Sequence, residues 1–521
     1  MDETKTIADE LAKEHKAASV AEFFEKNRHL LGFGSKRQAL LTVIKEAVDN
    51  SLDACEEAKE LPNILIKINN VGDDKFKIVI EDNGPGIVQA NLAKAFGKLL
   101  YGSKFHGNKQ GRGQQGIGIT SCILYAQLTT GKPSRVTSKI SEKKPAHTIV
   151  LMLDTKNNEP RIMEEGEDDS FKHVGTRVEL EVVADFINTG KQSLEEYLKR
   201  TSIINPHAQI MFVKPDGQKV IFKRSSNELP KQAKRIKPHP DGIELGILMK
   251  MLLNSETKSV KSFLMTEFSS IGAKTAEEII QKSRLDPRIK PKLLTRDQSE
   301  QLLKAMQVIP IQAPPLDCLS PIGEDNLFRS LKSEIPAEYY TTVTRKPTAY
   351  SGMPFQIEVG LAYGGELAKD QKAQVMRFAN KVPLVYEDYA CAITQAVKEV
   401  DWKRYGIDCP GGNPTGPLII VTHIASVWVP FTSEGKQAVA SRPEIIKEMK
   451  LGLMDAARKM QVYINKRQRD KYELERIGTF QRYSVEVAHA ISNILDLKQA
   501  DIEVKMKELL LSNQEEGTND E

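Results

Sequence analysis

Alternating apolar and polar positions mark strands in the first 225 residues of the chain. β-Branched residues recur at every second position in the segments 64–68, 75–80, 147–153 and 176–183. Such alternation is typical of strands with one buried face. Amphipathic helical segments and glycine-rich turns lie between these segments. The pattern therefore predicts an α/β sandwich with a mostly antiparallel sheet.

The period of the apolar positions changes after residues 225–242, a polar and basic segment with three prolines. Prolines and polar residues in such a run indicate a boundary between domains. Apolar residues then recur with helical spacing as far as about residue 308. The helical segments are 243–253, 259–268, 273–282 and 296–307. This spacing predicts a small helical module that is separate from the first sheet.

Strand patterns return after the proline-rich segment 309–324, at residues 355–365, 374–386 and 416–429. A helical segment, residues 388–400, lies between the second and third of them. A long helix is expected to begin near Ser441-Arg442-Pro443, because proline is favoured in the first helical turn. Its apolar positions, which keep a spacing of three and four residues, are Ile446, Met449, Leu453, Ala457, Met460 and Ile464. The acidic end, 512–521, is expected to be disordered.

Composition narrows the class of protein. A chain of 521 residues is expected to form two to four domains. No apolar run approaches the length of a membrane helix, and the charged N-terminus has no signal-peptide core, so we expect a cytoplasmic protein. The five cysteines are scattered, which argues against a zinc site and a disulfide framework. A net charge of +4 neither requires nor excludes nucleic acid.

The first candidate binding motif lies on the helix expected from residue 35 to 58. Glu46 and Asn50 are four residues apart and therefore share one face of that helix. Asn50 also lies in line with the apolar side of the helix. A carboxylate and an amide at the edge of a buried face need polar partners, and a metal-bound phosphate group would supply them. The alternative is a solvated helix edge with this spacing by chance.

The second motif, residues 82–87, follows the strand 75–80. A carboxylate fixed at a strand end, here Asp82, can accept a hydrogen bond from an exocyclic amine such as that of adenine. Gly86 would let a flat ring approach the backbone closely. The alternative is an ordinary Asp-Asn-Gly turn.

The third motif is the glycine loop from Gly111 to Gly118, followed by the apolar residues 119–128. Glycines that expose backbone N–H groups at the start of a helix form an anion-binding loop. The loop is not of the Walker type, since no Gly-Lys-Ser/Thr ends it, and it does not open a βαβ unit. The alternative is a flexible surface loop.

The order of these motifs, with Gly175-Thr176 opening a later strand, is more specific than any one of them. It resembles the Bergerat-type ATPase domain of gyrase, a heat-shock chaperone, histidine kinases and MutL. A closer resemblance, to the B subunit of archaeal DNA topoisomerase VI, spans residues 20 to about 475. The segments that carry it are AEFFEKN, EAVDNSLDA, KLLYGSKF, SFLMTEFSSIGAKTA, RKPTAYSGMPF, ANKVPLVY and DWKRYGI.

The resemblance implies an ATP site with Mg²⁺. Glu46 would be the general base that activates water, and Asn50 would hold the metal. Asp82 would bind the adenine amine, supported by Thr176, and Gly86 would give the ring room. The phosphate and ribose side would be lined by Ser103, Lys104, Gly113, Gln114, Gln115, Gly116, Ile117, Gly118, Ile119 and Thr120. Lys436, from the second strand-rich region, would contact the γ-phosphate; without the resemblance it reads as an ordinary loop lysine.

Contact with double-stranded DNA rests on basic segments. Residues 212–237 are rich in lysine and arginine, and a second group is formed by Lys282, Arg284, Arg288, Lys290 and Lys292. Spaced cations suit phosphate contacts, although a solvated basic face is an equal alternative. The resemblance implies a helix–two-turn–helix module here. It also implies a DNA-facing loop formed by Trp402, Lys403, Arg404 and Tyr405, for which the alternative is a cluster that packs the end of a helix.

The resemblance further implies an α+β multidomain assembly. Its parts would be a dimerisation strap (1–20), the ATPase domain (21–228), the helix–two-turn–helix domain (229–308), a transducer domain with a long helix (309–480) and a C-terminal segment (481–521). We find no motif for strand cleavage, so cleavage would come from an A subunit in an A2B2 heterotetramer, docked at residues 466–476. ATP would close a gate between two copies of this chain, and no membrane is involved.

Two other functions remain open from the sequence. One is a gyrase-like or MutL-like ATPase of the same superfamily, against which the helical module argues. The other is a non-catalytic, ATP-gated DNA clamp, against which the presence of Glu46 argues. Measuring ATP hydrolysis with and without DNA separates the clamp from the enzyme.

Overall fold

The computed structural model describes most of the chain. Its described residues are 22, 24, 26–102, 108–113, 116–190, 192–433, 435–495 and 498–506. The predicted strap (1–20) and the acidic end (512–521) lie outside the described residues. So do four of the predicted site residues, Ser103, Lys104, Gln114 and Gln115.

The first sheet has eight strands in the order β5-β4-β3-β6-β2-β1-β7-β8. Its strands are β1 (Asn63–Gly72), β2 (Lys75–Asp82), β3 (Ser134–Lys139), β4 (His147–Asp154), β5 (Glu159–Glu167), β6 (Gly175–Val183), β7 (Gln209–Val213) and β8 (Lys219–Phe222). Neighbouring strands are antiparallel except β1 and β7. The expected mostly antiparallel sheet is therefore confirmed. The sequence pattern missed β3, β5, β7 and β8.

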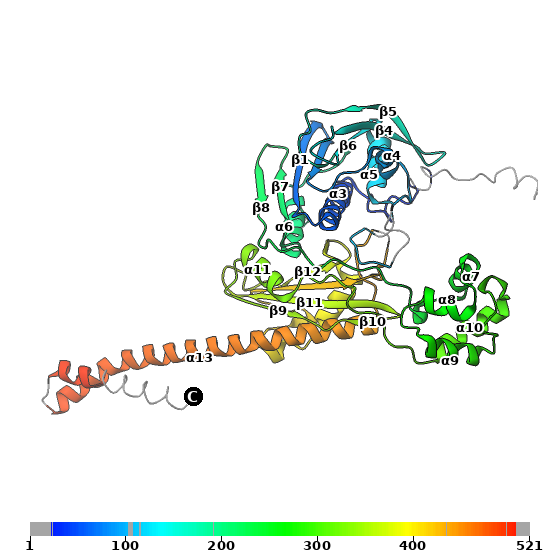
Figure 1. The fold of residues 1–521 in the computed structure, drawn as a ribbon. Helices are drawn as coiled ribbons and strands as arrows, with labels where there is room; N and C mark the ends of the chain where they lie inside the picture. Colours follow the sequence, from blue (N-terminus) through cyan, green and yellow to red (C-terminus); the bar gives the residue numbers. More distant parts are fainter. Residues whose placement is uncertain are drawn as a thin grey trace, which may run out of the picture.

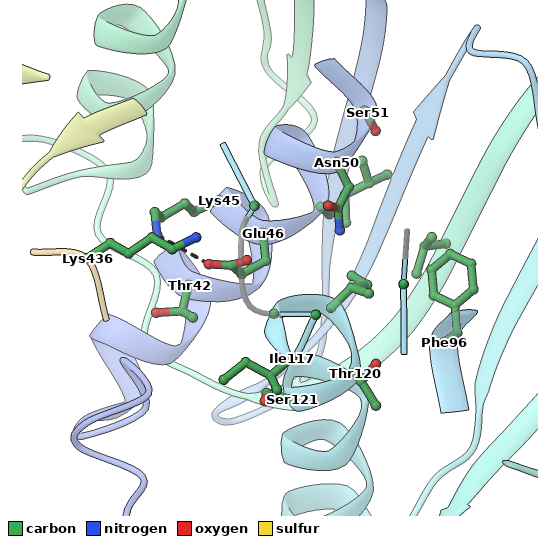
Figure 2. A pocket seen from close by; sticks show the side chains of 18 of the residues that line it. Thr42, Lys45, Glu46, Asn50, Ser51, Phe96, Ile117, Thr120, Ser121 and Lys436 are labelled. Atoms are coloured by element: carbon green, nitrogen blue, oxygen red, sulfur yellow. Dashed lines mark hydrogen bonds and ion pairs between the residues drawn. The ribbon is translucent and has the colours of Figure 1, made fainter. Parts of the chain in front are cut away.

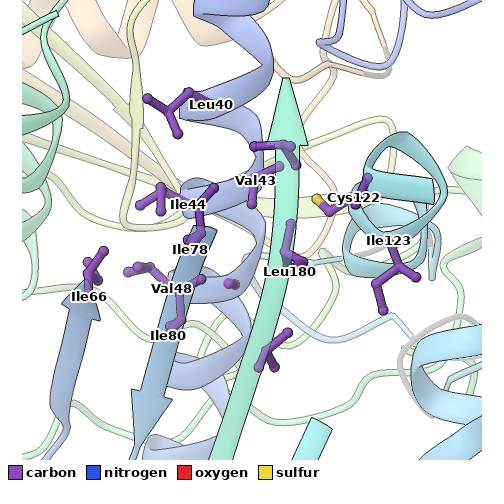
Figure 3. Close-up of a cluster of buried hydrophobic side chains, with 14 of the residues drawn as sticks. Leu40, Val43, Ile44, Val48, Ile66, Ile78, Ile80, Cys122, Ile123 and Leu180 are labelled. Carbon is purple, nitrogen blue, oxygen red and sulfur yellow. The ribbon is translucent and has the colours of Figure 1, made fainter. Parts of the chain in front are cut away.

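Helices cover one face of this sheet (Figure 1). They are α3 (Lys36–Ala58), α4 (Gln89–Gly97), α5 (Gly118–Thr130) and α6 (Leu194–Ile204). The hydroxyl of Ser35 caps α3 by accepting a hydrogen bond from the N–H of Gln38 at 3.2 Å. Apolar residues of α3, such as Val43 and Ile44, pack on strand residues such as Ile80 (Figure 3). This buried layer fixes the helix that carries the first motif.

The helical module follows the first sheet and has its own core. Its helices are α7 (Leu245–Asn254), α8 (Val260–Glu267), α9 (Ala273–Ser283) and α10 (Arg296–Val308). A Thr295–Gln298 capping box begins α10. Leu248, Phe263, Ile279 and Leu302 are fully buried inside the module. The module thus forms the separate helical unit that the spacing predicts.

The second sheet has the order β10-β11-β14-β12-β13, with β9 paired to β11. Its strands are β9 (Tyr339–Thr344), β10 (Thr348–Tyr350), β11 (Met353–Tyr363), β12 (Gln374–Ala379), β13 (Val382–Leu384) and β14 (Leu418–Ser426). Every residue of β14 is buried, because Ile420 faces one core and Ile419 and Val421 face another. A strand covered on both faces reads as a continuous apolar run.

Helices cover both faces of the second sheet. On one side lie α11 (Glu324–Glu334) and, from the first domain, α6; on the other lie α12 (Ala392–Glu399) and α13 (Pro443–Leu495). Short 3-10 helices are η1 (Pro240–Gly242), η2 (Pro291–Leu293), η3 (Asp388–Ala390), η4 (Trp402–Tyr405) and η5 (Pro410–Gly412). The shared core between α6 and α11 joins the two sheet domains.

The long helix α13 begins at Pro443, as predicted, and extends far beyond the rest of the molecule (Figure 1). Its six predicted apolar positions, from Ile446 to Ile464, are all buried against the second sheet. Residues 466–476 are exposed. The predicted domain boundary at residue 480 falls inside this helix. In the described part of the chain, no helix is long and apolar enough to span a membrane.

Candidate nucleotide-binding site

A cavity of about 300 Å³ lies where the first domain meets the second. Its walls are formed by α3, the end of β2, the glycine loop with the start of α5, and residues 383–386 and 435–437 of the second domain. A volume near the lower end of the usual range for ligand pockets suits a small molecule. Two domains therefore contribute to one cavity.

Glu46 lies on α3 at the wall of this cavity (Figure 2). Lys45 donates a hydrogen bond to its carboxylate at 3.2 Å. Burial raises the pKa of Glu46, but the positive charges of Lys45 and Lys436 outweigh burial and leave that pKa below its usual value. The carboxylate is therefore ionised at neutral pH, as a group that takes up a proton must be.

Gly118, the first residue of α5, packs directly against Glu46. A Cβ at this position would lie 2.0 Å from Glu46 Oε2, so a side chain would fit there only if the Glu46 carboxylate moved. The first N–H groups of a helix have no partner within the helix and attract anions. Gly118, Ile119 and Thr120 all line the cavity. The start of α5 thus offers an anion-binding wall beside a carboxylate.

Asn50 lies one helical turn after Glu46 and also lines the cavity (Figure 2). Its side chain is exposed, whereas its neighbours Asp49 and Ser51 are buried. An amide oxygen is a suitable ligand for Mg²⁺, which is commonly held by one or two protein oxygens together with substrate phosphates. The donor set at this wall therefore fits a metal carried by a nucleotide.

Asp82, the last residue of β2, also lines the cavity. Its carboxylate accepts hydrogen bonds from Ser51 Oγ at 2.8 Å, Gly84 N at 2.9 Å and Thr176 N at 3.2 Å. Burial raises the pKa of Asp82 despite these donors. The carboxylate is thus held in a fixed orientation toward the cavity, and Thr176 supports it through its backbone.

Gly86 has a backbone that only glycine accommodates. Its φ is 69°, and a Cβ would lie 2.3 Å from the carbonyl oxygen of Lys139. The residue lines the cavity near Asp82. A flat group can therefore approach the backbone at this point.

Lys436 enters the cavity from the second domain, 324 residues along the chain from its partner in the glycine loop. Its ammonium group donates a hydrogen bond to the carbonyl of Arg112 at 2.9 Å. Lys436 also has a left-handed backbone, with φ of 52°, which is unfavourable for a side chain of this kind. Burial lowers the pKa of the Lys436 ammonium group, although the negative charge of Glu46 acts to raise it. A buried cation is thus held beside Glu46 and the anion-binding wall.

The structure brings most predicted residues together around this one cavity. The described ones that line it are Glu46, Asn50, Asp82, Gly86, Gly113, Gly116, Ile117, Gly118, Ile119, Thr120, Thr176 and Lys436. Sequence reasoning missed Lys45, which pairs with Glu46, and Asp49, whose pKa burial raises to about 7. It also missed Tyr386, although the segment that contains it carried part of the resemblance.

The predicted DNA-facing cluster needs a correction. Trp402 and Tyr405 are buried in the core of the second domain, and Trp402 Nε1 donates a hydrogen bond to the carbonyl of Val397 at 2.8 Å. Lys403 and Arg404 are exposed. The two rings therefore pack the end of α12, which was the alternative interpretation, because large aromatic groups gain most from burial. Only the two cations remain available to DNA.

The fold and this cavity define a nucleotide-binding ATPase domain joined to a transducer domain. Residues 38–174 match the family model described as histidine kinase-, DNA gyrase B-, and HSP90-like ATPase. Residues 314–476 match the model for the transducer of the topoisomerase VI B subunit.

Relatives that match along most of the chain identify the family more closely than the two family models do. The chain is 49% identical over 498 residues to the B subunit of type 2 DNA topoisomerase 6 from Methanosarcina barkeri, covering 95% of this chain and 80% of the relative. It is 40% identical to the protein of that name from Pyrococcus horikoshii, covering 93% of each chain. The chain belongs to the topoisomerase VI B-subunit family. It is accordingly the ATP-binding subunit of a type II DNA topoisomerase.

Proposed function

We propose that this cavity binds and hydrolyses ATP with Mg²⁺. Lys436 contacts the γ-phosphate and thereby couples the nucleotide to the position of the transducer domain. Asp82, held by Thr176, receives the adenine amine, and Gly86 gives the ring room. Asn50 supplies one metal ligand. The remaining contacts to phosphate and ribose come from the glycine loop and from Ser103 and Lys104.

Hydrolysis needs a water molecule aligned with the γ-phosphate, and Glu46 is the group that orients it and accepts its proton. The low pKa of Glu46 keeps the carboxylate ready to accept a hydrogen bond. Mg²⁺, when bound with the nucleotide, neutralises charge on the phosphates. Lys436 adds positive charge where negative charge develops in the transition state.

One observation carries this proposal: a buried lysine from the second domain lies within the first domain's cavity, beside Glu46. A cation that reaches across a domain boundary can respond to the phosphate and move the domain that carries it. The pocket would then act as a coupling device as well as a binding site.

The family extends this to an assembly. We propose that two copies of the chain close as a gate on ATP binding, with residues 1–20 reaching the other copy. The A subunit would cleave both DNA strands in an A2B2 heterotetramer in the cytoplasm, docked at residues 466–476 of α13. Exposed cations at Lys403 and Arg404, and those at the end of α9 and around η2, would contact the DNA phosphates.

The test is the variant Lys436→Ala in the complex with the A subunit. We expect binding of a non-hydrolysable ATP analogue within about threefold of the wild type and ATP hydrolysis slower by roughly a hundredfold, as for the loss of one transition-state donor. Lys369→Ala, an exposed lysine of the same domain, is the control and should behave as the wild type. Near-normal turnover of Lys436→Ala would remove this lysine from the site.

A further inference from the structure

Two separate segments of the second domain hold two consecutive carbonyls of the glycine loop. Lys436 donates to the carbonyl of Arg112, at 2.9 Å, and Asn380 Nδ2 donates to the carbonyl of Gly111, at 3.2 Å. The loop therefore has a second contact with the transducer domain, one that does not face the nucleotide cavity. This contact comes from the turn between β12 and β13.

The Asn380-Lys381 turn has an unfavourable backbone for its sequence. Asn380 has φ of 48° and Lys381 has φ of 63°, so both central residues are left-handed, as in a type I′ turn. Asparagine tolerates this conformation, but the second position favours glycine. A lysine at that position costs conformational free energy, which indicates that its side chain has a role.

That side chain lies in a buried polar group behind the glycine loop. Lys381 Nζ donates to Ser320 Oγ at 2.9 Å and lies 3.9 Å from Glu56 Oε2. Arg112 forms an ion pair with the same Glu56 at 2.6 Å, and His207 contacts it at 2.8 Å. Glu56 is on α3, the helix of Glu46 and Asn50. One carboxylate thus links α3, the glycine loop and the β12–β13 turn.

The turn is also fixed rigidly to the second sheet. Asn380 accepts a hydrogen bond from Ser426 N at 2.8 Å and donates to Ser426 O at 2.9 Å. The N–H of Lys381 donates to His423 Nε2 at 2.9 Å, and His423 Nδ1 lies 2.8 Å from Glu358 Oε2. His423 and Glu358 are both completely buried. The turn is therefore bonded to the glycine loop on one side and to β14 on the other.

We propose that Asn380 and Lys381 are positioning residues that couple the glycine loop to the transducer sheet, independently of Lys436. This rests on the proposed ATP site. Lys436 must leave the Arg112 carbonyl to reach a phosphate, whereas Asn380 keeps the Gly111 carbonyl because it faces away from the cavity. The loop then stays attached to the transducer while the catalytic lysine changes partner. Turnover, rather than nucleotide binding, depends on that attachment.

The decisive variant is Asn380→Asp in the full complex with the A subunit and DNA. Aspartate tolerates the left-handed turn and still accepts from Ser426 N–H, but it cannot donate to the carbonyl of Gly111 or to that of Ser426. We expect a folded protein with a lowered melting temperature, affinity for a non-hydrolysable ATP analogue with Mg²⁺ within about threefold, and kcat lower by about tenfold with KM little changed.

Two further variants complete the test. Lys381→Gly favours the type I′ turn but deletes the ammonium group, so it should keep the fold and lower the stimulation of ATP hydrolysis by DNA. Asn413→Asp makes the same chemical change at an amide that donates to Gly411 within its own loop, and it should behave as the wild type.

The outcomes separate this inference from the proposed function. Normal kcat and normal stimulation by DNA in both Asn380→Asp and Lys381→Gly would overturn the coupling role. A normal kcat in Asn380→Asp together with a lowered kcat in a further variant, Asn380→Gly, would show that only the bond accepted from Ser426 N–H matters, which also overturns it. Failure of the wild-type complex to bind the analogue would instead refute the ATP site itself.

Discussion

The two sides of the glycine loop differ in how their polar groups are satisfied. On the cavity side, Asn50 is exposed and the start of α5 faces open space. On the other side, Arg112 is buried and paired with Asp53 and Glu56, both at 2.6 Å. The cavity side therefore offers donors and acceptors to a ligand, whereas the other side pairs most of its charged groups within the protein.

This difference indicates that the two sides of the glycine loop have different roles: one binds a ligand, and the other holds segments of the protein together. Groups left open to a cavity gain their partners only when a ligand binds, so changing them should affect catalysis more than stability. Groups paired in a buried network hold segments together, so changing one leaves its partners unpaired at a high cost. Each prediction below tests one side of this contrast.

The largest effect is expected on the cavity side, at Glu46. Glu46→Gln keeps the shape of the side chain but removes the negative charge that accepts the proton of water. We expect ATP hydrolysis to fall by roughly 10²- to 10⁴-fold, the usual contribution of a general base, while the affinity for a non-hydrolysable analogue changes little. Steady-state kinetics measure the rate of hydrolysis, and calorimetry measures the affinity for the analogue. Glu57→Gln, an exposed neighbour on the same helix, is the control; a fast Glu46→Gln enzyme would show that another group is the base.

On the side of the glycine loop away from the cavity, a substitution should lower the stability of the fold. Arg112→Leu leaves Asp53 and Glu56 without their common cation, and we expect the free energy of unfolding to fall by about 3–5 kcal/mol. Urea denaturation followed by circular dichroism measures this. Lys36→Met removes an exposed ion pair with Asp74 and should cost far less, because solvent screens the two charges. Equal losses of unfolding free energy in the two variants would mean that the buried ion pairs of Arg112 contribute no more to stability than an exposed ion pair does.

Asp49 lies between the two sides and gives a pH-dependent prediction. Burial raises its pKa from 3.8 to about 7, although Lys45, Arg112 and Lys436 oppose this shift. The folded protein therefore keeps a proton that the unfolded chain loses, so stability falls as the pH rises from about 4 to 7. Asp49→Asn cannot ionise, and its advantage over the wild type should grow across that range, to at most about 4 kcal/mol above pH 7.

Melting temperatures at several pH values measure this difference between Asp49→Asn and the wild type. The control is Asp74→Asn, because Lys36 lowers the pKa of Asp74, and loss of that carboxylate should be slightly destabilising at neutral pH instead. A constant difference between Asp49→Asn and the wild type from pH 4 to 8 would contradict the assignment of a raised pKa to Asp49.

The smallest effect is expected far from the loop, at the exposed cations after α12. Reversing both charges, Lys403→Glu with Arg404→Glu, should reduce the stimulation of ATP hydrolysis by DNA a few-fold and leave basal hydrolysis unchanged. The reduction should shrink at high salt, because phosphate contacts are screened. The fold should hold, since the buried partners Trp402 and Tyr405 are kept. Unchanged stimulation at low salt would remove this loop from the DNA-contacting surface.

The sequence alone determined the features that depend on local spacing. Glu46 and Asn50 share a face of α3 because they are four residues apart, and Asp82 ends β2 because the alternation stops there. The buried face of α13 followed from its three- and four-residue spacing. Gly86 could also be assigned, since a close approach of another group to the backbone leaves no room for a side chain.

Only the tertiary structure decided what lies opposite these residues. Lys436 donates a hydrogen bond to Arg112 of the glycine loop, 324 residues away in the sequence. Glu56 lies close to Arg112, His207 and Lys381, which come from three distant segments. Trp402 looked like a surface aromatic beside two cations, but the packing of α12 and α13 buries it. Periodicity reports the environment along one element, whereas a partner from another element is fixed by how the domains pack. That packing placed Lys436, a cation of the second domain, beside the carboxylate of Glu46 in the first.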